Sequence, residues 1–242
     1  MTDSKTLESL ALRALIVDLD GTLVDTLGDF EVALNRMLAD LDLPPIDRLA
    51  IEARVGKGSE HLIRTVLSLV QVQAPEAWGG RHLDDLCVQA WPRYQHHYLA
   101  INGAHSQVYP GAASALAGFR ALGYRMACLT NKPTAFARPL LEAKGLLDYF
   151  ELVFGGDAFA RKKPDPLPLL ETCAALGVAP SQALMIGDSS NDAQAAQAAG
   201  CPVVLVSYGY NHGLPVRTIP ADAWVDSMLD IRLRSCEPIQ VL

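Results

Sequence analysis

The stretch LIVDLDGTL at residues 15–23 decides the fold. Its first three residues are apolar, and an acidic segment that contains a glycine follows them directly. A short apolar run that ends in polar residues and glycine is typical of a strand buried on both faces, as in a parallel sheet. Side chains along an extended segment alternate between two sides, so we expect Asp18 and Asp20 to point the same way and Leu19 to point into the protein. Gly21 then permits a tight turn away from the strand.

Similar apolar runs recur along the chain and alternate with helical patterns. The predicted strands are residues 14–18, 125–129, 152–154, 183–186 and 203–206. The predicted helices are residues 112–122, 133–144, 166–176 and 191–199. A glycine follows each of these helices, which is a common C-terminal stop. The alternation predicts an α/β fold, a doubly wound parallel sheet with a Rossmann-like core.

A long segment between the first two predicted strands has a different character. Residues 27–105 show helical apolar spacing and no convincing strand, and they are too many for a single crossover helix. The sequence from Thr26 to Asp29 resembles a capping box at the start of the first helix. We therefore expect a helical cap of residues 27–105, inserted into a core made of residues 1–26 and 106–242.

Composition limits the classes of function. The chain has 242 residues, 50% hydrophobic and 19% charged, with a net charge of −7, an ordinary globular balance. No run of Lys and Arg suggests a nucleic-acid partner. No stretch approaches the length of a membrane span and residues 1–5 hold no apolar leader, so we expect a cytoplasmic protein without membrane association. The five scattered cysteines form no CxxC motif and are interpreted as reduced thiols.

Polar residues with possible chemistry come after the later strands, and each has a simpler structural explanation. Thr130 and Asn131 precede a helix, where free backbone N–H groups suit a phosphate oxygen, but they could equally be ordinary helix caps. Lys163 precedes a proline, which favours an extended backbone, and such a lysine can reach a phosphate. Its neighbour Lys162 makes a pair of solvated loop lysines the simpler interpretation.

A last cluster contains two carboxylates, Asp188 and Asp192, after the strand at 183–186. Mg²⁺ favours one or two carboxylates together with water and substrate oxygens, whereas helix capping is the simpler role. Because ligands bind at the carboxyl ends of parallel strands, the acidic and polar residues are expected in one crevice. These residues are Asp18, Asp20, Thr130, Lys163, Asp188 and Asp192.

Taken together, the motifs resemble a known family. The segments DLDGT at 18–22, TN at 130–131, KP at 163–164 and GDSSND at 187–192 look like the four ordered motifs of the haloacid dehalogenase superfamily. The helical insert is similar to the cap of members whose cap follows the first strand. More narrowly, the chain resembles the phosphoglycolate phosphatases at YPG 109–111, TNKP 130–133, GGD 155–157, KPDP 163–166 and YGYN 208–211.

The resemblance implies an Mg²⁺-dependent phosphatase that converts 2-phosphoglycolate to glycolate and phosphate through an aspartyl-phosphate on Asp18. Asp20 would act as general acid and then as general base. Since halide leaves without an acid, dehalogenases of the superfamily lack this second aspartate, and its presence favours phosphoryl transfer. The residues that would bind the phosphoryl group are Thr130, Asn131 and Lys163.

The implied metal site consists of Asp18, the backbone carbonyl of Asp20, and Asp188. Asp192 would support the Mg²⁺ ion through water or through the ligands around it. Lys163, which precedes the proline, is preferred over Lys162 as the phosphate lysine.

The cap is expected to choose the substrate, and the loop VGKG at 55–58 is the candidate for reading it. Gly56 would permit close approach, and Lys57 could meet a substrate carboxylate, although a solvated loop lysine fits the sequence equally well. A phosphonate hydrolase would need a cap lysine for a Schiff base, and Lys57 is the only lysine between Lys5 and Lys132.

Other phosphotransfer enzymes with the same motifs remain alternatives: a sugar-phosphate phosphatase, a pyrophosphatase or a phosphosugar mutase. A catalytically silent binding protein is a further alternative, whose mark would be loss of Asp18 or Asp20. The expected partner is a small phosphorylated metabolite, and the protein is expected to be a monomer or a homodimer.

Overall fold

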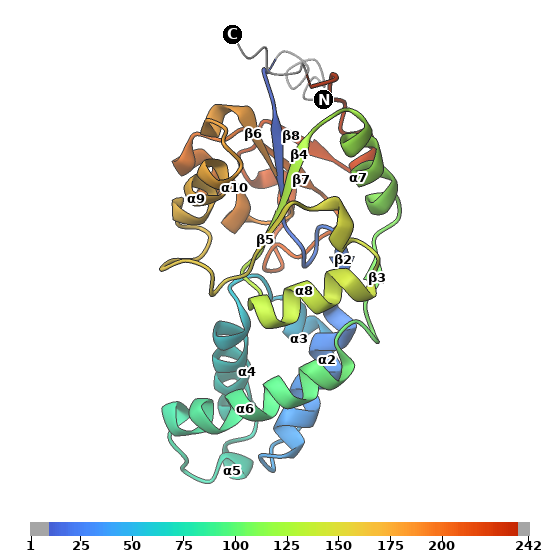
Figure 1. Cartoon of the computed structure of the whole chain (residues 1–242). Helices are drawn as coiled ribbons and strands as arrows, with labels where there is room; N and C mark the ends of the chain where they lie inside the picture. Colours follow the sequence, from blue (N-terminus) through green and yellow to red (C-terminus); the bar gives the residue numbers. More distant parts are fainter. Residues whose placement is uncertain (1–9, 237–242) are drawn as a thin grey trace.

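A six-stranded parallel sheet forms the centre of the molecule in the computed structural model, which describes residues 10–236 (Figure 1). The expectation for residues 1–5 lies outside the described range. Neighbouring strands follow the order β5-β4-β1-β6-β7-β8, and each pairing is parallel. The predicted doubly wound α/β fold is confirmed. The strands are β1 (Ala14–Val17), β4 (Arg125–Leu129), β5 (Leu152–Phe154), β6 (Ala183–Gly187), β7 (Val203–Val206) and β8 (Ala223–Val225).

Strand β1 shows how the sheet divides the core. Leu15 and Val17 pack on one face of the sheet, whereas Ala14 and Ile16 pack on the other, as the alternation of side chains along a strand requires. Helices cover both faces, which explains why the strands are continuous apolar runs. The helices are α7 (Ala112–Ala121) and α8 (Thr134–Ala143) on the first face, and α9 (Leu167–Ala175) and α10 (Ser190–Ala199) on the second.

The limits of these predicted strands and helices agree with the structure to within one residue at each end. The edge strand β8 was not predicted, because three half-buried residues are too few to give a pattern. Strands β2 (Val24–Asp25) and β3 (Gln107–Val108) were missed for the same reason. They pair antiparallel, with Val24 opposite Val108, and so join the two chain crossings between the sheet and the helices of the insert.

The chain between β2 and β3 forms a helical bundle with a core of its own. Leu34, Val66 and Tyr94 belong to this core, and Phe136 of α8 joins it from the sheet side. In Figure 1 the bundle, called the helical segment below, lies beneath the sheet and next to α8. Across residues 10–236, none of the helices has the length and apolar character needed to cross a membrane. The helices are α2 (Leu27–Ala39), α3 (Arg48–Glu52), α4 (Ser59–Gln73), α5 (Pro75–Trp78) and α6 (Leu83–Ile101).

The predicted capping box at the start of α2 is wrong. The Thr26 side chain makes no capping hydrogen bond, and its hydroxyl is buried without a hydrogen-bond partner in the described residues. The carboxylate of Asp29 instead accepts hydrogen bonds from the backbone N–H groups of Gly103 and His105, both at 2.8 Å, and from the hydroxyl of Ser106. The local pattern failed because Asp29 is used by a distant part of the chain, where it fastens α2 to the second crossing.

Candidate active site

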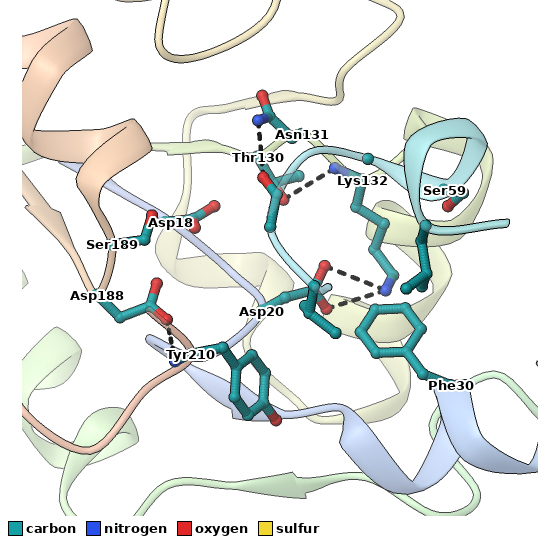
Figure 2. A pocket seen from close by; sticks show the side chains of 14 residues that line it. Asp18, Asp20, Phe30, Ser59, Thr130, Asn131, Lys132, Asp188, Ser189 and Tyr210 are labelled. Atoms are coloured by element: carbon teal, nitrogen blue, oxygen red, sulfur yellow. Dashed lines mark hydrogen bonds and ion pairs between the residues drawn. The ribbon is translucent and has the colours of Figure 1, made fainter. Parts of the chain in front are cut away.

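Three strands of the sheet end at one pocket (Figure 2). The N–H of Asp18 donates to the carbonyl of Ile186 at 2.9 Å, and that of Thr130 to the carbonyl of Phe154 at 3.0 Å. Both residues thus continue the ladder as the chain leaves the sheet, and Asp188 follows β6 directly. The helical segment lines the opposite side of the pocket with Phe30, Val55, Gly56, Gly58, Ser59 and Leu62.

Lys163 joins two of the carboxylates. Its Nζ lies 3.0 Å from Oδ1 of Asp18 and 2.7 Å from Oδ1 of Asp192, and it donates to the carbonyl of Leu129 at 2.8 Å. Burial on its own would lower the pKa of Lys163, but the charges of Asp18 and Asp192 raise that pKa above its usual value. The ammonium therefore stays charged. Lys162 forms a partly exposed ion pair with Glu60 at 3.0 Å instead.

Asn131 holds the backbone of Lys163 in place. Its Oδ1 accepts from the N–H of Lys163 at 3.0 Å, and its Nδ2 donates to the carbonyl of the same residue at 2.8 Å. Nδ2 also donates to the carbonyl of Gly56 at 2.9 Å. Asn131 therefore connects the sheet edge both to the lysine loop and to the helical segment.

Burial leaves the carboxylates of the pocket in excess of the positive charge around them. It raises the pKa of Asp18 from 3.8 to about 7, although Lys163 opposes the rise. Burial, followed by the charges of Asp192 and Asp18, raises the pKa of Asp188 well above its usual range. Asp188 Oδ2 accepts from the N–H of Tyr210 at 2.5 Å and its Oδ1 from the hydroxyl of Thr22 at 3.1 Å. A proton or a bound cation can relieve this excess of negative charge.

The oxygen atoms fit a hard divalent cation such as Mg²⁺. One carboxylate oxygen each of Asp18, Asp188 and Asp192 lies within 4.8 Å of the others. No hydrogen bond from the described residues is directed at Oδ1 of Asp18, although it is buried. Both oxygens of Asp192 are engaged, Oδ1 by Lys163 and Oδ2 by the N–H and hydroxyl of Ser189. Asp18 and Asp188 are thus better placed to bind a cation directly than Asp192, which also ties down the start of α10.

Asp20 faces a lysine that the sequence analysis gave no role. Nζ of Lys132 lies 2.9 and 3.3 Å from the two carboxylate oxygens of Asp20 (Figure 2). The same Nζ lies 4.5 Å from the ring centre of Phe30 and 4.6 Å from that of Tyr98, within the range of cation–π attraction. The motif TNKP contained Lys132, but nothing in one sequence pairs it with Asp20 or with two rings of the helical segment.

The structure brings Gly56 to the pocket but not Lys57. Gly56 has a φ of +115°, and its carbonyl accepts from the side-chain amides of Asn131 and Asn191 at 2.9 and 3.1 Å. Lys57 is exposed and is not among the lining residues. Burial and then the charge of Lys57 lower the pKa of His212, so the lysine lies near that histidine outside the pocket. The glycine turn points the backbone inward and the lysine outward, contrary to the role expected for Lys57.

Tyr210 was also missed as a site residue. Besides the bond from its N–H to Asp188, its hydroxyl accepts from the N–H groups of Thr26 and Leu27 at 2.9 and 3.2 Å and donates to Asp25. It therefore connects the acidic cluster to the first crossing into the helical segment. The motif YGYN drew attention to this loop, but its long-range contacts have no sequence pattern.

Comparison with known proteins agrees with this geometry. Residues 12–200 match the family model of the haloacid dehalogenase-like hydrolases. The chain belongs to this family. The haloacid dehalogenase-like hydrolase described here is 43% identical over 224 residues to the phosphoglycolate phosphatase of Thiobacillus denitrificans, covering 93% of this chain and 96% of that one. It is 42% identical over 221 residues to the enzyme of that name from Nitrosospira multiformis, covering 91% and 94%.

A solved structure adds the same agreement at the level of the fold. The crystal structure of a predicted phosphoglycolate phosphatase from Haemophilus somnus 129pt superposes on this hydrolase with a TM-score of 0.87 at 32% identity. The match covers 92% of this chain and 97% of that chain. The family predicted from the four motifs is confirmed, and the match extends over both the sheet and the helical segment.

Proposed function

We propose that this protein is an Mg²⁺-dependent phosphatase that hydrolyses 2-phosphoglycolate to glycolate and phosphate through an aspartyl-phosphate on Asp18. The observation that carries the proposal is the buried Asp18 carboxylate at the pocket, with Oδ1 unengaged by hydrogen bonds from the described residues and only 3.0 Å from the Lys163 ammonium. The names of the relatives support the phosphatase class and the substrate.

In the first step an oxygen of Asp18 attacks phosphorus, and the bond between phosphorus and the glycolate oxygen breaks. Asp20 in its acid form gives its proton to that oxygen, so glycolate leaves as the alcohol. In the second step water attacks phosphorus, Asp20 accepts the proton, and the Asp18 carboxylate is released with inorganic phosphate. Throughout, Lys163 and Thr130 balance charge on the phosphoryl oxygens, and Asn131 keeps the backbone of Lys163 in position.

Asp18, Asp188 and the backbone carbonyl of Asp20 would hold Mg²⁺, with Asp192 fixing Lys163 and the start of α10. When bound, Mg²⁺ neutralises charge on the phosphate and on the surrounding carboxylates. Mg²⁺ and Lys163 together offset the cost of burying several acidic groups beside an anionic substrate.

The helical segment supports the proposed division into a cap of residues 27–105 and a core of residues 1–26 and 106–242. Six residues of the helical segment line the pocket, so its packing against the sheet excludes water from the reacting groups. The proposed partner is a small phosphorylated metabolite, with no nucleic acid and no membrane involved. We propose a cytoplasmic protein, present as a monomer or a homodimer.

The alternative substrates differ in what the pocket must offer. A phosphonate hydrolase needs a cap lysine in the pocket, and Lys57, the one lysine in residues 27–105, lies outside it. The pocket has no comparable feature against a sugar phosphate, a pyrophosphate or a phosphosugar mutase reaction.

The test is Mg²⁺-dependent phosphate release from 2-phosphoglycolate beside sugar phosphates, pyrophosphate and phosphonoacetaldehyde. The proposal predicts the highest kcat/KM for 2-phosphoglycolate, by at least about tenfold, because a carboxylate matched to the site adds at least one charge-assisted interaction. A higher kcat/KM for another compound would contradict the proposed substrate. No release from any of these compounds would contradict the phosphatase assignment itself.

A further inference from the structure

We propose that Lys132 is the residue that selects a phosphate ester with a carboxylate in its leaving group, by pairing with that carboxylate. The inference rests on the proposed phosphatase function and deepens it. It replaces Lys57, the residue that the sequence suggested for this task.

The first argument is position relative to the reacting atoms. The general acid must reach the oxygen that leaves phosphorus, so Asp20 marks the leaving-group side of the pocket. Nζ of Lys132 is hydrogen-bonded to the Asp20 carboxylate at 2.9 Å. In a glycolate ester a single CH₂ separates the leaving oxygen from the carboxylate. A cation in contact with Asp20 therefore lies where that carboxylate must come.

The second argument is charge. Of the described residues that line the pocket, Lys132 alone has a positively charged side chain, against the carboxylates of Asp18, Asp20 and Asp188. Lys163 is buried behind Asp18, on the side of the transferring phosphoryl group. A second anionic group on the substrate would be repelled by these carboxylates, and burying it without a cation would be costly.

The third argument is the hydrogen-bonding capacity that Lys132 retains. An ammonium has three N–H donors. Among the described residues, the hydrogen bonds of the Lys132 ammonium go to the two oxygens of Asp20. Its other neighbours are the faces of Phe30 and Tyr98 at 4.5 and 4.6 Å, which attract the charge without taking a strong hydrogen bond. The ammonium thus has a donor for a substrate carboxylate without giving up Asp20.

The aromatic rings also explain why this lysine is selective. The side chain of Lys132 is 1% exposed, and Phe30 and Tyr98 belong to α2 and α6 of the helical segment. The ring contacts hold the ammonium in one place and exclude water from it, which strengthens its interaction with an anion. Exposed Lys57 lacks both features.

The experiment compares two phosphonates that cannot be hydrolysed. 3-Phosphonopropionate is 2-phosphoglycolate with CH₂ in place of the ester oxygen, and propylphosphonate has the same length without the carboxylate. Their inhibition constants are measured against hydrolysis of p-nitrophenyl phosphate, at fixed ionic strength, for the natural protein, Lys132→Met and the matched control Lys57→Met. Methionine keeps the length of the side chain and packs well against aromatic rings.

We expect the natural protein to bind 3-phosphonopropionate about 100-fold more tightly than propylphosphonate, as one buried charge-assisted pair provides. Lys132→Met should reduce this ratio to within about threefold of one, and Lys57→Met should preserve it, because only the buried lysine interacts with the anion strongly. A ratio near one in the natural protein would overturn the inference without any variant, so misfolding of Lys132→Met cannot hide a failure. An unchanged ratio in Lys132→Met, or a ratio lost in Lys57→Met, would also overturn it.

The substrate measurement separates this inference from the proposed function. If the ratio depends on Lys132 but 2-phosphoglycolate is a poor substrate, the carboxylate selection stands and the proposed substrate is wrong. If 2-phosphoglycolate is the best substrate but the ratio does not depend on Lys132, the proposed function stands and the inference is wrong.

Discussion

Lys163 and Lys132 are both buried at the pocket, yet their surroundings come from different parts of the molecule. Lys163 is paired with Asp18 and Asp192 and bound to a carbonyl of β4, all on the sheet side. Lys132 is paired with Asp20 but lies between two aromatic rings of the helical segment. The phosphoryl end of the pocket is therefore built by the sheet alone, whereas the leaving-group end is completed only where the helical segment packs against it.

The most severe way to break the sheet side is Asp18→Asn. The amide keeps the shape of the side chain but is a far poorer nucleophile, so kcat should fall at least about 10⁴-fold. Phosphate release under single-turnover conditions measures the effect, and circular dichroism checks the fold. Turnover within tenfold of the natural protein would remove Asp18 from the reaction.

The next largest effect is expected from Lys163→Met. It removes the cation that faces the transferring group, and kcat should fall by about 10³-fold. Lys162→Met is the matched control, because Lys162 pairs with the exposed Glu60, and it should change kcat/KM by less than about threefold. Equal losses in the two variants would contradict the assignment of Lys163 to the phosphoryl end.

A stability measurement sharpens the contrast on the helical side. Asp29→Ala removes the buried acceptor for the N–H groups of Gly103 and His105, and the free energy of unfolding should fall by about 3 kcal/mol. Asp47→Ala, which removes an exposed cap bond to the N–H of Ala50 at 2.7 Å, should cost about 1 kcal/mol. Urea denaturation gives both values, and a smaller loss for Asp29→Ala than for Asp47→Ala would refute the anchoring role of Asp29.

The smallest predicted effect concerns pH and Mg²⁺. Because burial raises the pKa of Asp18 from 3.8 to about 7, the native state holds a proton that the unfolded state has released. Without metal, the free energy of unfolding should therefore fall as pH rises through this window. Mg²⁺ must displace that proton, so its affinity should rise by about tenfold between pH 6 and pH 8.

Calorimetric titration with Mg²⁺ at the two pH values measures this change in affinity. Asp18→Asn serves as the control, since an amide has no such proton to lose. An affinity of the natural protein that is independent of pH would show that Asp18 is already ionised before the metal binds.

The two ends of the pocket also differ in how far the sequence predicts them. Asp18 and Asp188 follow apolar runs whose limits were predicted to within one residue, and parallel strands necessarily bring their carboxyl ends to one edge. Preference for Lys163 over Lys162 rested on the proline that follows it, and the structure has the same lysine beside Asp18. Local chemistry and one rule of topology were enough to bring these residues together.

The leaving-group end could not be predicted in this way. The contacts of Lys132 with Phe30 and Tyr98 join residues from separate helices of the insert to a loop of the sheet, and no spacing in the chain records such packing. The same limit explains the wrong capping box at Asp29, whose partners lie more than 70 positions further along the chain. Lys57 was chosen for its charge, but the direction of its side chain depends on the backbone of the glycine turn.

The most direct test of the account is to mix the protein with 2-phosphoglycolate and Mg²⁺, stop the reaction with acid within the first turnover, and locate phosphate on the protein by peptide mass spectrometry. We predict a phosphoryl group on Asp18, formed no more slowly than phosphate is released and absent from Asp18→Asn. Release of glycolate and phosphate without any phosphoryl group on Asp18, or with that group on another residue, would contradict the account.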